Sequence, residues 1–204
     1  MKNHNLENLD LRNLNYERKN NTLLKIILGI FVFVMVFVFF MSMRATEVQA
    51  YPISKEPISI GSFATKFNLE NKPRVENLRL ASQAISGVVL NPGDVFSYNA
   101  TVGPTTEARG FKKAEIIVKG EKKQGFGGGV CQISSTLYNA ALKAGMEIIE
   151  RHPHSKEVPY VAKNKDAATS YGGIDLKFKN TKEHPVLISA SVQGNNVFVD
   201  IYKA

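Results

Sequence analysis

Cysteine is nearly absent from this chain, since Cys131 is the only one in 204 residues. Small secreted domains that depend on disulfides carry several cysteines in even number, so no internal disulfide holds this chain together. An unpaired thiol in an oxidising compartment can be oxidised or cross-linked. If the chain is exported, Cys131 is therefore either buried and inert or retained for its chemistry.

Basic clusters and metal-binding motifs are missing as well. No run of lysine or arginine is long enough to indicate nucleic-acid binding. Neither CxxC nor HExxH occurs, so no familiar spacing indicates a metal. The sequence also has no internal repeat and no low-complexity tract. From these absences we expect no nucleic-acid partner, no metal and no cofactor.

One long apolar run is present near the N-terminus, "IILGIFVFVMVFVFFMSM" at residues 26–43. A run of about eighteen apolar residues is enough to cross a bilayer, and the excess of positive charge lies before it. The sequence therefore predicts a cytoplasmic tail over 1–22, a single-pass transmembrane anchor in the lipid bilayer over 23–43, and an extracytoplasmic remainder. The alternative is a secreted protein cleaved after Ala50, because "VQA" at 48–50 suits a signal peptidase.

The remaining residues, 51–204, are enough for one domain with its own core. They contain 20 Lys and Arg against 14 Asp and Glu. A basic surface of this kind fits an anionic partner, such as a cell-wall polymer or lipid head groups, although the same charge can simply aid solubility.

Helical spacing recurs twice in this outer part. Residues 73–87 begin with a proline suited to a first turn and end at Gly87, a typical C-terminal cap. Residues 130–144 predict a helix with one buried face, formed by Ile133, Leu137, Ala140, Ala141 and Ala144. Strand patterns occur at 58–63, 114–119, 146–151 and 174–179, and in a hairpin of 186–192 with 197–202. Residues 44–72 otherwise form a spacer, and residues 120–129 a loop. The pattern predicts an α+β domain with two main helices packed on a mainly antiparallel sheet and a C-terminal β-hairpin.

Cys131 falls in the first turn of the second helix, one residue after a run of three glycines. The positive end of the helix dipole and its unpaired amides favour a thiolate there, which lowers the pKa of a cysteine. Without side chains, Gly128 and Gly129 would let a substrate carbonyl approach backbone amides that form an oxyanion hole. Gln132, the next residue, is a further candidate contact to substrate or oxyanion. Cys131 is thus a candidate nucleophile, and a buried inert cysteine is the alternative.

The general base has few candidates, and the best ones lie in "ERHPHS". Pro153 favours an extended backbone before it, so His152 and His154 are expected on one side of the chain, His154 as the base and His152 beside it. Arg151 is a candidate substrate contact, and the carboxylates of Asp166 and Asp175 are candidates to orient the base. Two alternatives stay open at this point: exposed polar histidines without function, and a zinc ion bound by the cysteine and both histidines.

Four motifs in this order closely resemble the VanW family: "LNPGDVFSYNATVGP", "GGGVCQISSTLYNAALKAG", "ERHPHS" and "IDLKFKN". The resemblance implies a VanW-like extracytoplasmic domain over residues 73–204. Members are typically membrane-anchored or secreted bacterial proteins, and VanW domains have been linked to peptidoglycan cross-linking as L,D-transpeptidases with a cysteine nucleophile. The resemblance thus implies peptidoglycan stem peptides as partners and gives Cys131 the nucleophilic role. One alternative is a non-catalytic accessory protein that binds the cell wall or acts in glycopeptide resistance. The other is a cysteine hydrolase of the same bond.

Overall fold

The computed structural model describes residues 25, 28–31, 33–35, 37, 57–118 and 120–204. The chain divides into two compact units, Met1–Ser54 and Lys55–Ala204. In the first unit the described residues are helical, and no helix among them has the length and apolar character needed to cross a membrane. The anchor expected at 23–43 falls largely outside the described residues, as do the tail and the cleavage site after Ala50, so all three stay predictions.

The second unit is built on a four-stranded antiparallel sheet in the order β1-β9-β8-β2. Its strands are β1 (Ser59–Lys66), β9 (Asn196–Lys203), β8 (Val186–Gln193) and β2 (Val89–Leu90). The predicted C-terminal hairpin is confirmed as β8 and β9, with Val197, Val199 and Ile201 buried on one face. The strand expected at 58–63 is present as β1, which runs to Lys66 and pairs along β9.

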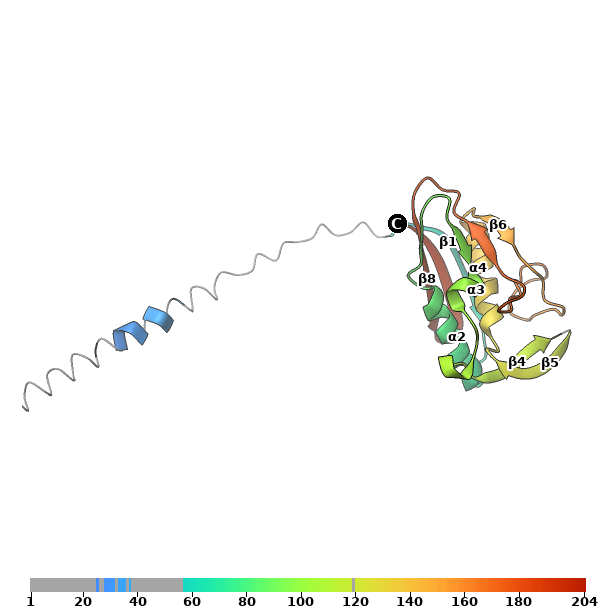
Figure 1. Ribbon diagram of the computed structural model, residues 1–204, viewed down its shortest axis with the longest axis horizontal. Helices are drawn as coiled ribbons and strands as arrows, with labels where there is room; N and C mark the ends of the chain where they lie inside the picture. Colours follow the sequence, from blue (N-terminus) through green and yellow to red (C-terminus); the bar gives the residue numbers. More distant parts are fainter. Residues whose placement is uncertain (1–24, 26–27, 32, 36, 38–56, 119) are drawn as a thin grey trace, which may run out of the picture. The chain divides into compact units, whose positions relative to one another are not determined.

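Helices α2 (Lys72–Ile85) and α4 (Val130–Lys143) pack against this sheet, as Figure 1 shows. The five residues predicted for the inner face of the second helix are all buried, which confirms its periodicity. Strand β1 crosses this helix so closely that a Cβ on Gly61 would lie 2.4 Å from the carbonyl oxygen of Ala140. Only glycine allows the strand this approach, and the core lies between the two helices and the sheet.

Two smaller sheets complete the unit. One has the order β3-β7-β6, with β3 (Val95–Ser97), β7 (Lys177–Lys179) and β6 (Glu147–Glu150). The other is a hairpin of β4 (Lys113–Val118) and β5 (Glu121–Phe126). Along the chain, α3 (Tyr98–Val102) and a short 3-10 helix, Glu107–Arg109, lie between β3 and β4. Together these elements confirm the predicted α+β class.

Strand β5 corrects the prediction of a loop over 120–129. Its sequence, "EKKQGF", is largely exposed and carries little apolar pattern, so periodicity gave no sign of a strand. The strand forms because each of its residues pairs with one of β4. The expected strand at 174–179 is also shorter than predicted, since only its last three residues pair with β3 and β6.

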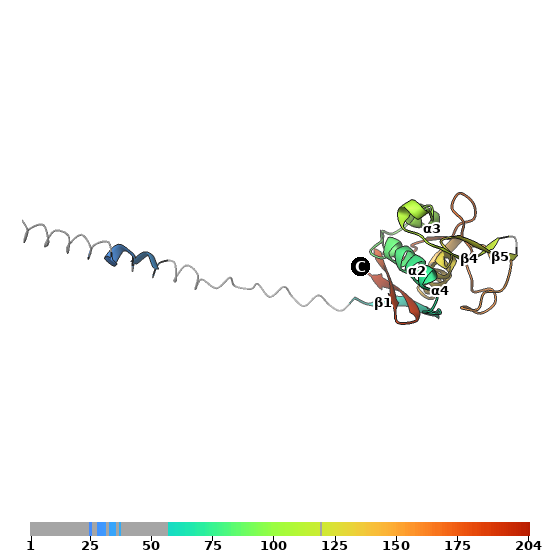
Figure 2. The same cartoon turned by 90° about the horizontal axis from the view of Figure 1, so that it is seen from below.

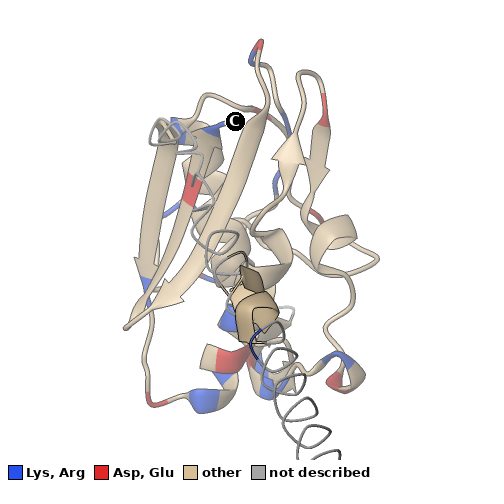
Figure 3. Cartoon of the chain, turned by 90° about the vertical axis from the view of Figure 1, so that its left-hand side faces the viewer, with Lys and Arg blue, Asp and Glu red and all other residues tan. Residues whose placement is uncertain are grey.

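The charged residues of this unit are interspersed over helices, strands and loops in the view of Figure 3. Several form ion pairs with near neighbours, for example Arg79 with Glu76 at 2.7 Å and Lys123 with Glu121 at 2.9 Å. In this view the excess of lysine and arginine is therefore not gathered into one basic face.

Candidate active site

A cleft of about 1150 Å³ opens beside the start of α4, and Cys131 lies in its wall. The β4–β5 hairpin forms one side, and the segment after β6, with residues 154–160 and 169–171, contributes another. Figures 1 and 2 show the hairpin and this segment extending on the same side of the unit. The predicted nucleophile is thus half-buried but in contact with a cavity large enough for a peptide segment.

The three glycines before Cys131 shape the turn that starts α4. Gly127 and Gly129 have φ angles of 81° and 110°, which side chains strongly disfavour. A Cβ on Gly128 would lie 2.6 Å from the carbonyl oxygen of Glu115, so this glycine packs directly against β4. Gly128 does not line the cleft, and its placement does not favour the expected contact to substrate.

Backbone amides near the thiol remain available within the described part of the chain. The amides of Val130 and Gln132 donate to the carbonyls of Gly127 and Gly129 at 3.0 and 2.8 Å. Those of Gly129 and Cys131 donate to no acceptor among the described residues. Because both residues line the cleft, their amides are the candidate donors to an oxyanion.

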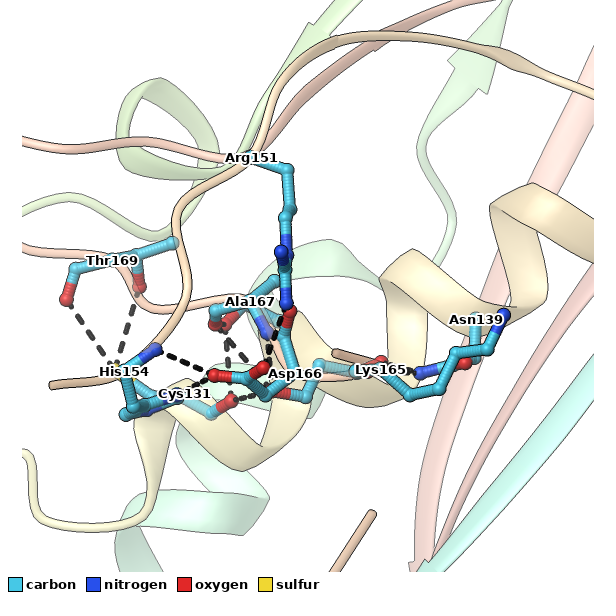
Figure 4. A network of polar contacts seen from close by, with 10 residues as sticks. Cys131, Asn139, Arg151, His154, Lys165, Asp166, Ala167 and Thr169 are labelled. Carbon is cyan, nitrogen blue, oxygen red and sulfur yellow. Dashed lines mark hydrogen bonds and ion pairs between the residues drawn. The ribbon is translucent and has the colours of Figure 1, made fainter. Parts of the chain in front are cut away.

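His154 and Asp166 extend the site behind the thiol, as Figure 4 shows. Nδ1 of His154 lies 2.7 Å from Oδ2 of Asp166, and the backbone amide of His154 donates to the same oxygen at 2.6 Å. This contact fixes the ring and leaves Nε2 without a hydrogen-bond partner among the described residues, while Cys131 lines the same cleft. The imidazole is only 7% exposed. The structure therefore brings together a cysteine, a histidine and an aspartate in the order of a catalytic triad.

Electrostatics in this chain favour the charged forms of both reacting groups. Burial alone would raise the pKa of Cys131, but the neighbouring His154 and the hydroxyl of Thr169 lower it below its ordinary value. Burial would likewise lower the pKa of His154, but Cys131 and the carboxylate of Asp166 raise it. The two shifts point the same way, toward a thiolate beside an imidazolium.

Thr169 contacts the sulfur in two ways. The thiol donates a hydrogen bond to the carbonyl oxygen of Thr169 at 3.3 Å, a contact that only the protonated form can make. The hydroxyl of Thr169 lies 3.8 Å from the sulfur and can donate to it once the thiol is ionised. Thr169 can therefore form a hydrogen bond with the sulfur in either protonation state.

Arg151 holds the aspartate. Its Nε donates to the backbone carbonyl of Asp166 at 2.6 Å, and its Nη2 to Oδ1 at 2.7 Å. The guanidinium also lies over the ring of Tyr138, 5.5 Å from its centroid. Arg151 does not line the cleft, so the structure places it behind the base rather than against a substrate.

Polar residues of α4 position the segment that carries Asp166. Ser134 donates to the carbonyl of Ala167 at 2.6 Å, and Ser135 accepts from the amide of Ala167 at 2.9 Å. One turn further, Asn139 donates to the carbonyl of Lys165 at 2.6 Å. Buried small polar residues inside a helix are the one signal in "QISSTLYN" that could have revealed this docking.

Two of the expected site residues lie elsewhere. Nε2 of His152 lies 3.1 Å from a carboxylate oxygen of Glu150, outside the cleft. The alternation of a strand does not apply here, because His152 forms only an isolated bridge with Ala168. Asp175 is buried and accepts from the hydroxyl of Ser97 and the amide of Asn99, so it caps α3 instead of orienting the base.

Gln132 lines the cleft, but its side chain is only 1% exposed and its amide is engaged within the fold. It donates to the hydroxyl of Thr65 and the carbonyl of Lys66 in β1, and it accepts from Arg74 at 2.9 Å. Arg74 lines the cleft and was not anticipated, since a single arginine in the first turn of a helix carries no sequence signal.

The three residues considered as zinc ligands are not grouped together. Zinc bound by the cysteine and both histidines would need His152 beside Cys131, and His152 pairs with Glu150. Within the described residues, no three side chains of His, Cys, Asp or Glu are grouped so that they could hold a metal ion.

Fold and site together define an α+β domain with a thiol, an imidazole and a carboxylate in sequence at a cleft. A family model described as "VanW like protein" matches residues 73–202, and the chain belongs to this family. The resemblance of the sequence motifs is thereby confirmed, and Cys131, His154 and Asp166 all fall within the matched region.

Two curated relatives are similar to this chain. It is 43% identical over 145 residues to "Uncharacterized protein YoaR" of Bacillus subtilis, which covers 71% of this chain and 48% of the relative. It is 30% identical over 138 residues to "Vancomycin B-type resistance protein VanW" of Enterococcus faecalis, covering 65% of this chain and 50% of the relative. The chain thus spans about half the length of these relatives. No solved structure matches it.

Proposed function

We propose that this protein is an L,D-transpeptidase-like cysteine acyltransferase that acts on peptidoglycan stem peptides outside the cell. The observation that carries the proposal is the position of the buried His154 ring, which contacts Asp166 at 2.7 Å and lines the same cleft as Cys131. The opposite pKa shifts of the thiol and the imidazole support it. Tethering to the membrane through the apolar segment 26–43 is part of the proposal and rests on the sequence.

The first half-reaction forms a thioester. The thiolate of Cys131 attacks the carbonyl carbon of a stem-peptide residue, and the electron pair of the carbonyl moves to its oxygen. The amides of Gly129 and Cys131 would stabilise this oxyanion. When the intermediate collapses, the C–N bond breaks and the imidazolium of His154 gives its proton to the leaving amine.

The second half-reaction transfers the acyl group. An amine of a neighbouring stem attacks the thioester while neutral His154 accepts the proton that the amine loses. The C–S bond breaks, the sulfur leaves as a thiolate, and the ion pair with the imidazolium is restored. Water in place of the amine would make the protein a hydrolase, so the acceptor alone separates these two activities.

A mass measurement on intact protein tests the nucleophile. The full-length chain, purified in detergent because of its apolar segment, is incubated with a soluble stem tetrapeptide and with a sacculus digest. We expect a covalent acyl adduct that is lost in Cys131→Ala, and cross-linked dimers among the digest products. Shortened stems without dimers would instead establish the hydrolase.

The two histidines provide a matched pair for testing the base. His154→Ala removes the ring between thiol and carboxylate, and we expect the rate of adduct formation to fall by about a hundredfold or more. His152→Ala, two residues away and outside the cleft, should leave that rate unchanged. Equal losses in both variants would contradict the assignment of the base.

A non-catalytic role in glycopeptide resistance is the second candidate, favoured by the name of the Enterococcus faecalis relative. It predicts that purified Cys131→Ala protein binds sacculi as well as the unaltered chain does, with no adduct and no change in muropeptides from either protein. That combination of results would replace the enzymatic proposal.

A further inference from the structure

Arg74 places a positive charge in the cleft beside the nucleophile. It lies in the first turn of α2, where its amide donates to the capping side chain of Asn71 at 3.2 Å. A Cβ on Gly129 would lie 3.0 Å from Cγ of Arg74, so the arginine stem runs directly over the turn that presents Cys131. Arg74 and Gly129 both line the cleft.

The guanidinium is held in position by a buried amide. Nη2 of Arg74 donates to Oε1 of Gln132 at 2.9 Å. The nitrogen of the same amide is engaged by Thr65 and Lys66, so the amide cannot turn around without losing two hydrogen bonds. An arginine fixed in this way keeps most of its five donors for another partner, at little cost in side-chain entropy.

No carboxylate of the described residues lies within ion-pair distance of Arg74. Glu115, an acidic residue of the cleft, is paired with Lys122 at 2.9 Å. Burial is the largest influence on the pKa of Arg74 and lowers it, although a guanidinium stays charged at neutral pH. A half-buried cation without a counter-ion is unfavourable, and a bound anion would relieve the cost.

The charge of a Cys131 thiolate raises the pKa of Arg74, but that thiolate is already matched by the imidazolium of His154. We propose that Arg74 binds the free C-terminal carboxylate of the substrate peptide, so that Cys131 attacks the last peptide bond and releases a single terminal residue. The identity of the peptide as a stem rests on the proposed function. A guanidinium fork matches a carboxylate, and Arg74 lines the same cleft as Cys131, with its stem against Gly129, two residues before the nucleophile.

Binding without turnover tests this anchor. Full-length Cys131→Ala protein in detergent is titrated with a fluorescent stem tetrapeptide that ends in a free carboxylate, and with the same peptide ending in a carboxamide. We expect the acid to bind about tenfold or more tightly than the amide. Adding Arg74→Gln should weaken binding of the acid to the level of the amide.

Two further variants separate charge, geometry and folding. Arg74→Lys keeps the charge without the fork, and we expect it to retain only part of the preference for the acid. Arg79→Gln removes an arginine of the same helix that pairs with Glu76 outside the cleft. This variant should retain the full preference for the acid over the amide. Equal binding of acid and amide to Cys131→Ala, or a preference that survives Arg74→Gln, would overturn the anchor.

Adduct formation on the unaltered chain distinguishes failure of the anchor from failure of the proposed reaction. A carboxylate preference that depends on Arg74, with no adduct from either peptide, would leave the anchor standing and refute the acyltransferase. Adducts that form equally fast from acid and amide would refute the anchor and leave the acyltransferase standing.

Discussion

Asn77 connects the glycine turn before Cys131 to helix α2. It is fully buried in α2, and its Nδ2 donates to the carbonyls of Lys112 and Gly128, both at 2.9 Å. Its Oδ1 accepts from the amide of Lys112 at 2.7 Å. Three hydrogen bonds from one amide thus tie the helix to the start of β4 and to the turn before Cys131.

Replacing Asn77 with Ala removes all three hydrogen bonds, and among the described residues only the carbonyl of Lys112 keeps another donor, the amide of Gly127. At about 1 kcal/mol for each lost hydrogen bond, the expected loss in the free energy of unfolding is about 3 kcal/mol. That is a large part of the stability of a typical domain. Because the turn loses its tie to α2, we also expect the alkylation rate of Cys131 at neutral pH to fall toward that of an ordinary thiol.

Urea unfolding followed by circular dichroism measures the first effect, and iodoacetamide labelling of the folded protein the second. Asn91→Ala is the matched control, since its exposed side chain contacts only Asp94 in a surface turn and should change stability by less than about 0.5 kcal/mol. Asn77→Asp keeps the acceptor for Lys112 but removes both donors. If Asn77→Asp proves as stable as the unaltered chain, the two donated hydrogen bonds do not hold the turn and the reasoning fails.

Two other changes probe the base and the turn. Asp166→Asn removes a carboxylate that raises the pKa of His154, so the imidazolium should lose its proton at lower pH. The alkaline limb of the pH profile of adduct formation should then move to lower pH, and an unchanged alkaline limb would contradict this role. Gly128→Ala forces a Cβ against the backbone of β4 and should cost about 1–3 kcal/mol in thermal unfolding. Gly172→Ala meets no neighbour and should cost only the strain of its left-handed backbone, about 1 kcal/mol; equal losses would refute the packing argument.

Local periodicity was enough to predict the parts of the fold that bury one face. The helix of 130–144 and the alternation of Val197, Val199 and Ile201 follow directly from spacing, because a helix or strand must turn its apolar side toward the core. Strand β5 lacks such a pattern, since its residues are mostly exposed and its pairing with β4 is the interaction that forms it. Pairing between distant residues leaves no period in a sequence.

The same distinction applies to the candidate site. The position of Cys131 at a helix start could be predicted, because the glycines and the helix pattern are adjacent in the chain. The difference between His152 and His154 could not, because it depends on Asp166, which α4 holds through Ser134 and Ser135. Spacing alone made the two histidines equivalent, while hydrogen bonds from elsewhere in the chain separate them.

Gln132 illustrates why residues adjacent in sequence can serve different parts of a site. Successive residues of a helix point about 100° apart, and Cys131 faces the cleft while Gln132 reaches β1 and Arg74. Strand β1 lies before residues 73–202, the region that the family model matches, yet Thr65 and Lys66 of this strand fix the amide that positions Arg74. The edge strand of the sheet is therefore part of the support for the cleft, and a change in β1 can alter the position of Arg74 through one buried glutamine.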